Sequence, residues 1–205
     1  MKLLSLNRGR AQALKVGRRM AQTGHFKHSL TGPVQLGPLG LEGDFIGNLK
    51  HHGGPDQAVY VYSAEDYRWW EQELGKPLPH GTFGENLTVD RLLRARIGDV
   101  WECGSVRLQI SAPRIPCATL AARMGESAFA RRFARANRGG AYARVLQPGL
   151  LQAGQSIQVH LSDGPLVDDL FALWHSPAKD PALMQAALAA PLAERARAAF
   201  LHWLK

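Results

Sequence analysis

Cys117 is the strongest candidate for a reactive group in this chain. An alternating apolar and polar stretch, 106–111, predicts a strand with one buried face, and two prolines after it predict a rigid turn. Cys117 follows this turn and begins a short predicted helix, 118–124, that Gly125 would end. The positive end of that helix and Arg114 both favour a thiolate, which attacks electrophiles and binds metals. The alternative is a cysteine that is only part of the core, because free cysteine is among the most buried residue types.

Two adjacent histidines, His51 and His52, open a glycine-rich segment, HHGGPDQ, that leads into a predicted strand at 58–62. Glycines let backbone N–H groups approach a ligand, and imidazole transfers protons and binds metals. Adjacent side chains on an extended backbone point to opposite sides, so we expect one histidine to face any pocket and the other to be structural. Purely structural roles for both are the alternative, because histidines are common on surfaces and in cores.

Two further glycine-rich segments carry polar side chains. In HGTFGENLTV, at 80–89, Glu85 and Asn86 supply an acceptor and a donor beside open backbone, although a tight structural turn would have the same pattern. The segment RGGAY begins at Arg138, directly after a predicted helix at 127–137 with a basic stripe. Such a stripe is most often a solvated helix face, but here it leads into glycines that again expose the backbone to a ligand.

Composition limits the class of protein. The 205 residues include 25 lysines and arginines against 17 aspartates and glutamates, a formal net charge of +8. This charge favours anionic partners, but the basic residues are dispersed, so nucleic acid is not indicated. A phosphate-bearing cofactor or an acidic protein partner also fits the charge. Cys103 and Cys117 have no zinc-ribbon spacing, and the composition predicts a reduced cytoplasmic enzyme. No stretch approaches the ~20 apolar residues of a membrane span, and the apolar start at 1–6 is too short for a signal peptide.

The elements that must position these residues are mostly short strands. Helices are expected from Ser63, which begins a capping box, to Gly75, and at 118–124 and 127–137. Strands are expected at 2–6, within 30–44, and at 58–62, 100–102, 105–111, 142–146 and 156–161. The segment 9–28 has no pattern that assigns it. Many short strands with glycine and proline turns indicate a mainly β fold, a β-barrel with a few inserted helices, rather than alternating β-α-β units.

The last part of the chain differs in character. Pro165, Pro181 and Pro191 each predict the start of a short helix, and the third helix ends near Lys205. Helices of this length are marginal alone, so they must pack on each other, on the barrel or on a partner. We therefore expect a barrel domain at 1–161 and a three-helix extension at 162–205. Docking of a partner and formation of a homodimer are further roles left open for the extension.

Six segments together resemble the MOSC family, which is named for the C-terminal domain of molybdenum cofactor sulfurase. They occur in the family's order across about residues 1–160, and the ordered set is far more specific than any one motif. The chain is most similar to the stand-alone bacterial subgroup that has a three-helix C-terminal extension and that acts as a 6-hydroxylaminopurine reductase. The segments are 40–44 (GLEGD), 52–60 (HGGPDQAVY), 81–87 (GTFGENL), 97–99 (IGD), 111–117 (SAPRIPC) and 138–145 (RGGAYARV).

This resemblance implies a MOSC-type β-barrel and a molybdenum cofactor, a molybdopterin whose metal is bound by Cys117. It also implies an oxidoreductase that reduces N-hydroxylated compounds, such as N-hydroxylated purine bases, to amines. Glu85 and Asn86 are then expected to border the pocket and to handle protons or orient the substrate. The chain has no flavin or cluster motif, so an external reductase of the flavoprotein or ferredoxin type must supply electrons. The groups expected to hold the pterin and its phosphate are His52, Gly53, Gly54, Gln57, Arg114, Arg138 and Gly139.

Three rival functions remain open. A cofactor-binding or sulfur-carrier module would hold a persulfide on Cys117 in place of a metal. A zinc or cysteine hydrolase would use Cys117 with His51, His52 or His80, although zinc hydrolases normally present three protein ligands. A nucleic-acid binder is motivated by charge alone and lacks an aromatic and basic platform.

Overall fold

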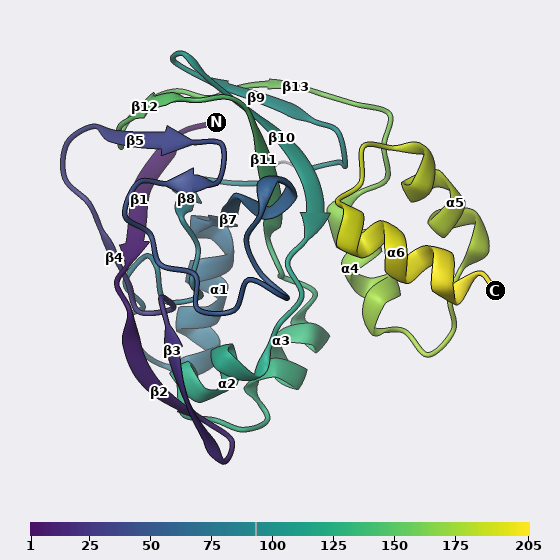
Figure 1. Ribbon diagram of the computed structural model, residues 1–205, viewed down its shortest axis with the longest axis horizontal. Helices are drawn as coiled ribbons and strands as arrows, with labels where there is room; N and C mark the ends of the chain where they lie inside the picture. Colours follow the sequence, from purple (N-terminus) through teal and green to yellow (C-terminus); the bar gives the residue numbers. More distant parts are fainter. Residues whose placement is uncertain (93) are drawn as a thin grey trace.

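One curled sheet of eight strands forms the centre of the fold. The structure is a computed structural model that describes residues 1–92 and 94–205. The strand order is β13-β9-β10-β11-β7-β8-β1-β4, and every pair is antiparallel except β7 with β8. A second sheet of order β12-β5-β6 and the β2-β3 hairpin complete the strands (Figure 1). The strands are β1 (Leu3–Gly9), β2 (Gln12–Val16), β3 (Arg19–Thr23), β4 (Lys27–Ser29), β5 (Val34–Gly37), β6 (Gly40–Leu41), β7 (Val59–Ser63), β8 (Leu87–Val89), β9 (Val100–Cys103), β10 (Val106–Pro113), β11 (Ala141–Gln147), β12 (Gly149–Leu151) and β13 (Gln158–His160).

The sheet curls back toward itself, as the mainly β prediction requires. The start of β1 meets the segment just before β13: the Leu3 amide donates to the Gln155 carbonyl at 2.9 Å, and the Ile157 amide donates to the Met1 carbonyl at 2.8 Å. Apolar side chains from β1, β7, β9, β10 and β11 fill the interior, where Leu6, Val106 and others are fully buried. The predicted mainly β barrel with a few inserted helices is confirmed by this topology.

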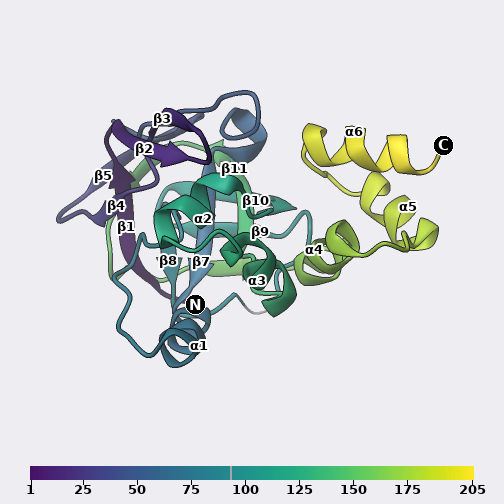
Figure 2. The ribbon, with the colours of Figure 1, turned by 90° about the horizontal axis from the view of Figure 1, so that it is seen from below.

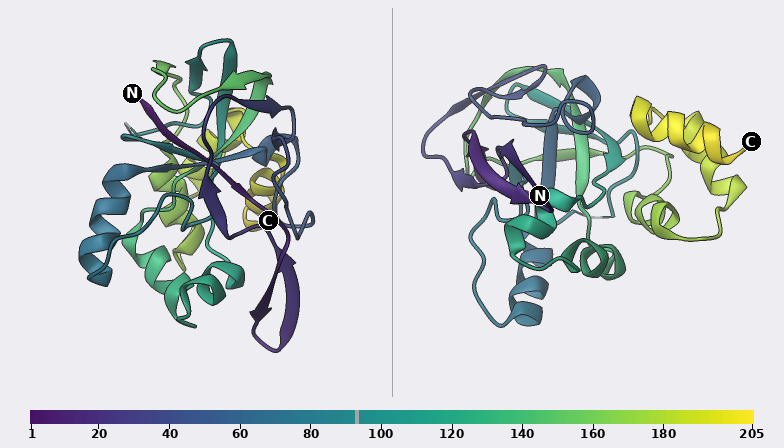
Figure 3. Two further views of the ribbon diagram at one scale, coloured as in Figure 1. Left: turned by 90° about the vertical axis from the view of Figure 1, so that its left-hand side faces the viewer. Right: turned by 60° about the horizontal axis from the view of Figure 1, so that its bottom comes forward.

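The segment that the sequence left unassigned forms an exposed hairpin. Strands β2 and β3 pair around Gly17, whose φ of 60° suits the turn, and then lead into β4 beside β1. Most side chains of both strands are exposed or half-buried, so the segment has no apolar alternation that would mark it as a strand. The hairpin extends past the sheet (Figure 3) and lies next to the second helix, α2 (Ala118–Met124).

Three helices cover one end of the sheet (Figure 2). They are α1 (Ala64–Leu74), α2 (Ala118–Met124) and α3 (Phe129–Ala136), close to the predicted ranges. The Ser63 hydroxyl accepts from the Asp66 amide at 3.0 Å and caps α1, as the capping box predicted. Trp70 of α1 stacks on Phe133 of α3 at 5.5 Å between ring centroids and 6° between planes. Aromatic packing, with Trp70 fully buried, therefore joins α1 and α3 into a second core.

The three predicted C-terminal helices are present as α4 (Val167–His175), α5 (Pro181–Ala189) and α6 (Glu194–Trp203). Figure 1 shows them gathered at one side of the sheet. Their apolar side chains, among them Leu170 and Phe200, belong to the same buried cluster as the interior of the sheet. Along the described stretches, 1–92 and 94–205, no helix has the length and apolarity needed to cross a membrane.

Candidate functional site

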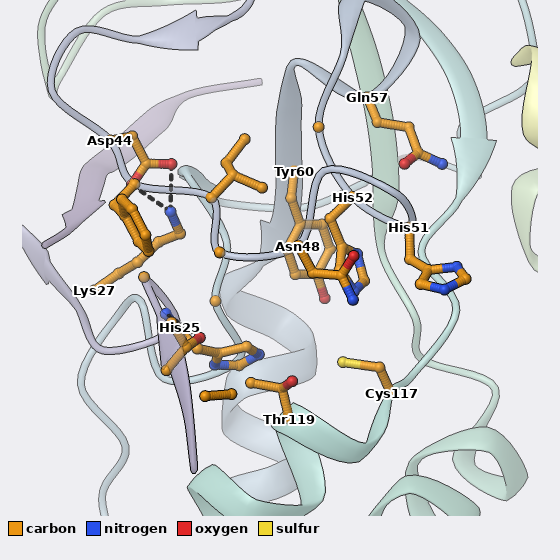
Figure 4. Close-up of a pocket in the computed structure, with 18 of the residues that line it drawn as sticks. His25, Lys27, Asp44, Asn48, His51, His52, Gln57, Tyr60, Cys117 and Thr119 are labelled. Atoms are coloured by element: carbon orange, nitrogen blue, oxygen red, sulfur yellow. Dashed lines mark hydrogen bonds and ion pairs between the residues drawn. The ribbon is translucent and has the colours of Figure 1, made fainter. Parts of the chain in front are cut away.

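A cavity of about 670 Å³ lies between the sheet, the β2-β3 hairpin and the start of α2. Side chains from segments far apart in the sequence converge on it (Figure 4). Cys117 and Thr119 come from α2, Tyr60 from β7 and His25 from the end of the hairpin. His51, a candidate residue of the rival hydrolase, lines this cavity. Six of the expected site residues line it as well: His52, Gly53, Gln57, Asn86, Arg114 and Cys117.

Cys117 lies at the N-cap of α2 with extended backbone angles, φ −130° and ψ 169°. Its thiol points into the cavity (Figure 4). Burial by itself raises the pKa of this thiol, but hydrogen bonding to His52 and the positive charge of Arg114 outweigh burial and lower the pKa to about 6. The side chain is thus a thiolate at neutral pH, which agrees with the expectation from the helix start and Arg114.

His52 is held between the thiol and a tyrosine. Its Nδ1 lies 3.3 Å from the Tyr142 hydroxyl, which leaves the other ring nitrogen for Cys117. Both His51 and His52 line the cavity, and Figure 4 shows their rings on the Cys117 side of it. His51 is exposed. The expected division between the two histidines is therefore met only in part: both line the cavity, but His52 contacts Tyr142 and Cys117 whereas the His51 side chain is exposed.

Arg114 is a buried cation with spare hydrogen-bonding capacity. Its residue is 3% exposed, and its guanidinium lies over the Tyr60 ring at 5.3 Å. Nη2 lies 3.4 Å from His25 Nε2, while Nη1 is buried without a hydrogen-bond partner among the described residues. An arginine without a carboxylate partner at the floor of a cavity is suited to an anionic ligand.

A polar cluster on the other side of the cavity was not anticipated from the sequence. Lys27 and Asp44 form an ion pair at 2.5 Å, with side chains 8% and 7% exposed. Asn86 Nδ2 donates to Asp44 Oδ2 at 2.8 Å, and its Oδ1 accepts from the Tyr60 amide at 3.1 Å. Asn86 thus holds the cluster to β7 and borders the cavity, as expected. Lys27 lies in the unassigned segment, whereas Asp44 ends the GLEGD segment, which was the available signal for it.

Glu85 does not line the cavity. Its side chain is fully buried, and one oxygen, Oε1, accepts from the Tyr67 hydroxyl at 2.7 Å, the Gly81 amide at 2.6 Å and the Thr88 hydroxyl at 2.8 Å. Burial raises the pKa of Glu85, although these donors partly offset the shift. The geometry assigns this carboxyl to fixing the loop that carries Asn86, not to contacting a substrate.

Three other expected residues also lie behind the cavity wall. Arg138 pairs with Asp66 at 2.6 Å and lies over the ring of Trp69 at 4.9 Å. Gly139 accepts the Tyr60 hydroxyl at 2.8 Å through its carbonyl, and it therefore supports a residue that does line the cavity. Gly54 is next to the wall but not in it. Arg138 and Gly139 consequently support the aromatic core, whereas Tyr142 of the same RGGAY segment lines the cavity and contacts His52.

The geometry does not assemble the ligands of a zinc hydrolase. His80 lies against Tyr67 at 5.2 Å between ring centroids and outside the cavity wall. Within residues 1–92 and 94–205, no three side chains of histidine, cysteine, aspartate or glutamate are grouped to hold a metal ion. A metal at Cys117 would therefore need most of its ligands from a cofactor.

The charged residues that line the cavity are suited to an anionic cofactor. Among the described lining residues, Arg19, Lys27 and Arg114 are cationic, and Asp44 is the one carboxylate, already paired with Lys27. The unpartnered Nη1 of Arg114 and the thiolate of Cys117 supply a donor for an anion and a soft metal ligand in one cavity. The residues present thus fit a molybdenum-bearing pterin with a phosphate.

Comparison with known proteins agrees with this geometry. The MOSC domain family matches residues 48–158, which include the His52 loop and Cys117. The uncharacterized protein YflK of Bacillus subtilis is 38% identical over 159 residues, covering 77% of this chain and 72% of YflK. A protein named Reductase from Gibberella moniliformis is 31% identical over 164 residues, but these cover 77% of this chain and only 29% of that protein. The crystal structure of YiiM from Geobacillus stearothermophilus superposes with a TM-score of 0.81 at 24% identity, over 100% of this chain and 99% of YiiM, which shows the fold.

Proposed function

The chain belongs to the MOSC domain family, which is associated with molybdenum-cofactor-related oxidoreductase activity, and on this premise we propose a molybdenum-cofactor-dependent reductase of N-hydroxylated compounds. Its substrates would include N-hydroxylated purine bases. The overall reaction takes R–NHOH, two electrons and two protons to R–NH₂ and water. The distant reductase relative supports an oxidoreductase in general terms.

The observation that carries the proposal is the state of Cys117. A thiolate that opens into a large cationic cavity, with pKa about 6, is the form of cysteine that binds a soft metal. When bound, the molybdenum cofactor would supply the two-electron redox chemistry. Cys117 would hold the metal, and Arg114 would offset the negative charge of the pterin and its phosphate.

The remaining cavity residues have distinct roles in the proposal. His52, Gly53 and Gln57 would hold one side of the cofactor, and His52 would also orient the thiolate. Asn86 and Lys27 border the space left for the substrate. Lys27 is a cation beside a carboxylate and carries protons that could pass to the departing oxygen.

Electrons must come from a separate reductase in this proposal, an acidic flavoprotein or ferredoxin. Arg131 and Arg135 are exposed on α3, which follows α2 directly in the chain. This basic face supports docking of an acidic protein by charge complementarity. Raising the salt concentration should then slow electron delivery from the donor but not from a small artificial reductant.

The test compares wild type with Cys117→Ser, both purified from a molybdenum-replete host. Near-stoichiometric molybdenum and pterin in wild type, with little molybdenum in the variant, would support the proposal. Reduction of 6-hydroxylaminopurine with an artificial donor should then follow molybdenum content. If both proteins were equally free of molybdenum and pterin, the proposal would be refuted.

A second candidate is a sulfur-carrier module with a persulfide on Cys117. The thiolate that supports metal binding supports this candidate equally, since a thiolate also attacks the outer sulfur of a donor persulfide, takes up that sulfur atom and releases the donor as its thiolate. Mass spectrometry of the intact protein distinguishes the two. A gain of one sulfur atom on Cys117 without molybdenum would favour the carrier.

A further inference from the structure

The C-terminal helices reach the candidate site through the start of α6. Arg195, in the first turn of α6, donates through Nη1 to the Gly53 carbonyl at 3.2 Å and to Gln57 Oε1 at 2.6 Å. Its Nη2 donates to the Leu49 carbonyl at 2.7 Å. One guanidinium therefore binds both ends of the segment 49–57, which contains His52. Charge-assisted bonds of this kind are stronger than neutral ones and have a fixed geometry because the guanidinium is planar.

A second contact joins the same segment to the helix end. The N-cap of α6 is Ala193, which has no side chain that can accept a hydrogen bond. Asp56 supplies the missing acceptor, since its Oδ2 accepts from the Glu194 amide at 2.9 Å. A carboxylate at a helix N-terminus is favourable both as an acceptor and through the helix dipole. The segment thus caps α6, and α6 in turn holds the segment.

The contacts of Asp56 continue into the sheet. Its Oδ1 accepts from Arg144 Nε of β11 at 3.1 Å, and its carbonyl accepts from the Ser111 hydroxyl of β10 at 2.5 Å. The Ser111 carbonyl also accepts from the Ala193 amide at 2.8 Å, so the sheet, the segment and α6 meet at one point. The end of the segment nearest the sheet is therefore fixed by several partners, whereas Leu49 and Gly53 are held from outside by Arg195.

We propose that Arg195 is a positioning residue, through which the C-terminal helices hold the segment 49–57 in the wall of the cavity. His52 faces Cys117 only while this segment keeps its place, because no regular strand or helix carries the histidine. The three-helix extension is thereby a part of the site and not merely an addition to the barrel. The link to cofactor retention rests on the proposed function, whereas the positioning itself does not.

Amide hydrogen exchange of the purified protein tests the positioning directly. The amides of His51 and His52 both donate to the Asn48 carbonyl, at 3.3 and 3.0 Å, so they report opening of the segment. In Arg195→Ala, we expect these amides to exchange roughly tenfold faster or more, because the segment loses its outer anchor. Arg195→Lys has one nitrogen and cannot reach both carbonyls, so it should give an intermediate acceleration and retain more molybdenum than the alanine variant.

Arg197→Ala is the matched control. Arg197 is two residues further along α6 and also donates to two carbonyls, those of Leu188 and Ala190, at 2.9 and 3.0 Å. Those bonds lie within the extension, so this variant should lose thermal stability while the exchange of His51 and His52 stays at the wild-type rate. Equal acceleration in both alanine variants, or none in either substitution of Arg195, would overturn the proposal. If Arg195→Ala does not fold, the lysine variant decides in the same way.

Molybdenum content separates this inference from the proposed function. A loss in the Arg195 variants with none in Arg197→Ala supports both. Faster exchange in the Arg195 variants of a protein that never carries molybdenum supports the positioning and refutes the proposed function. Normal molybdenum in wild type with unchanged exchange in the variants refutes the positioning alone.

Discussion

The ionisation of Cys117 gives the sharpest test of the site. With a pKa of about 6, the thiol is ~90% thiolate at pH 7, whereas an ordinary cysteine with a pKa of ~8.5 is only ~3% thiolate. In the metal-free protein, the rate of alkylation by iodoacetamide should therefore rise with pH through a midpoint near 6. The midpoint, not the plateau rate, is the quantity to compare, because thiolate nucleophilicity itself falls with pKa.

Substitution of His52 isolates the cause of this shift. In His52→Ala the burial of Cys117 remains and still raises its pKa, while Arg114 and the hydrogen bond from the Leu120 amide still lower it. The midpoint should move upward by about one to two pH units, so that alkylation at pH 6 slows roughly five- to fiftyfold. Loss of the histidine removes the hydrogen bond without removing the arginine, which makes the two contributions separable.

A Cys103→Ser background removes the second thiol from this assay. Burial raises the pKa of Cys103 to about 11, so it should contribute little below pH 9 in any case. A wild-type midpoint near 8.5 would refute the assignment of a thiolate, and an unchanged midpoint in His52→Ala would refute the role of the histidine.

Three further predictions concern the surroundings of the site. Phe133→Ala should lower the free energy of unfolding by about 3–5 kcal/mol in denaturant titration, because the ring is fully buried and stacks on Trp70; a loss below ~1 kcal/mol would contradict this packing. Burial raises the pKa of Glu85, so the folded chain binds this proton more tightly than the unfolded chain, and the contribution of Glu85 to stability should fall as the pH rises from its ordinary pKa through the raised one. The free energy of unfolding of wild type minus that of Glu85→Gln should therefore decrease between pH 4 and pH 8. A difference that increases over this range would contradict the raised pKa. Arg114→Ala should reduce the pterin content of the purified protein more than Arg138→Ala, because Arg114 lines the cavity whereas Arg138 is paired with Asp66 behind the cavity wall. Equal losses in the two variants would contradict this, because they would mean that a positive charge acts on the cofactor without contacting it.

Several features of this fold could be predicted from the sequence because they depend on residues that are close together in the chain. The helix from Ser63 to Gly75 was predictable because a capping box and a left-handed terminal glycine are local devices that need no tertiary partner. The position of Cys117 at a helix start was predictable for the same reason, since a proline-containing turn and a short apolar helix surround it. The mainly β class followed from the spacing of short strands and turns.

Which polar residues share the cavity depends on how distant segments pack together. Glu85, Arg138 and Cys117 all occur in glycine- or proline-rich segments, but only Cys117 of these three lines the cavity. The Glu85 side chain is buried in a hydrogen-bonded network with Tyr67, and Arg138 forms an ion pair with Asp66. Sequence neighbours cannot distinguish these outcomes, because the partners that decide them are Tyr67 and Asp66 on a helix elsewhere in the chain. The same limit hid Lys27, which begins β4 just after the exposed β2-β3 hairpin, in a segment with no apolar period.

The C-terminal helices are the clearest case of the same limit. Their existence was readable from three prolines and from apolar spacing, which are local signals. Their connection to the site was not, because Arg195 meets Gly53 and Leu49 only after the chain has folded back across more than a hundred residues. A sequence contains the donor and the acceptors, but their distance is a property of the whole fold, since it depends on how sheet and helices pack together.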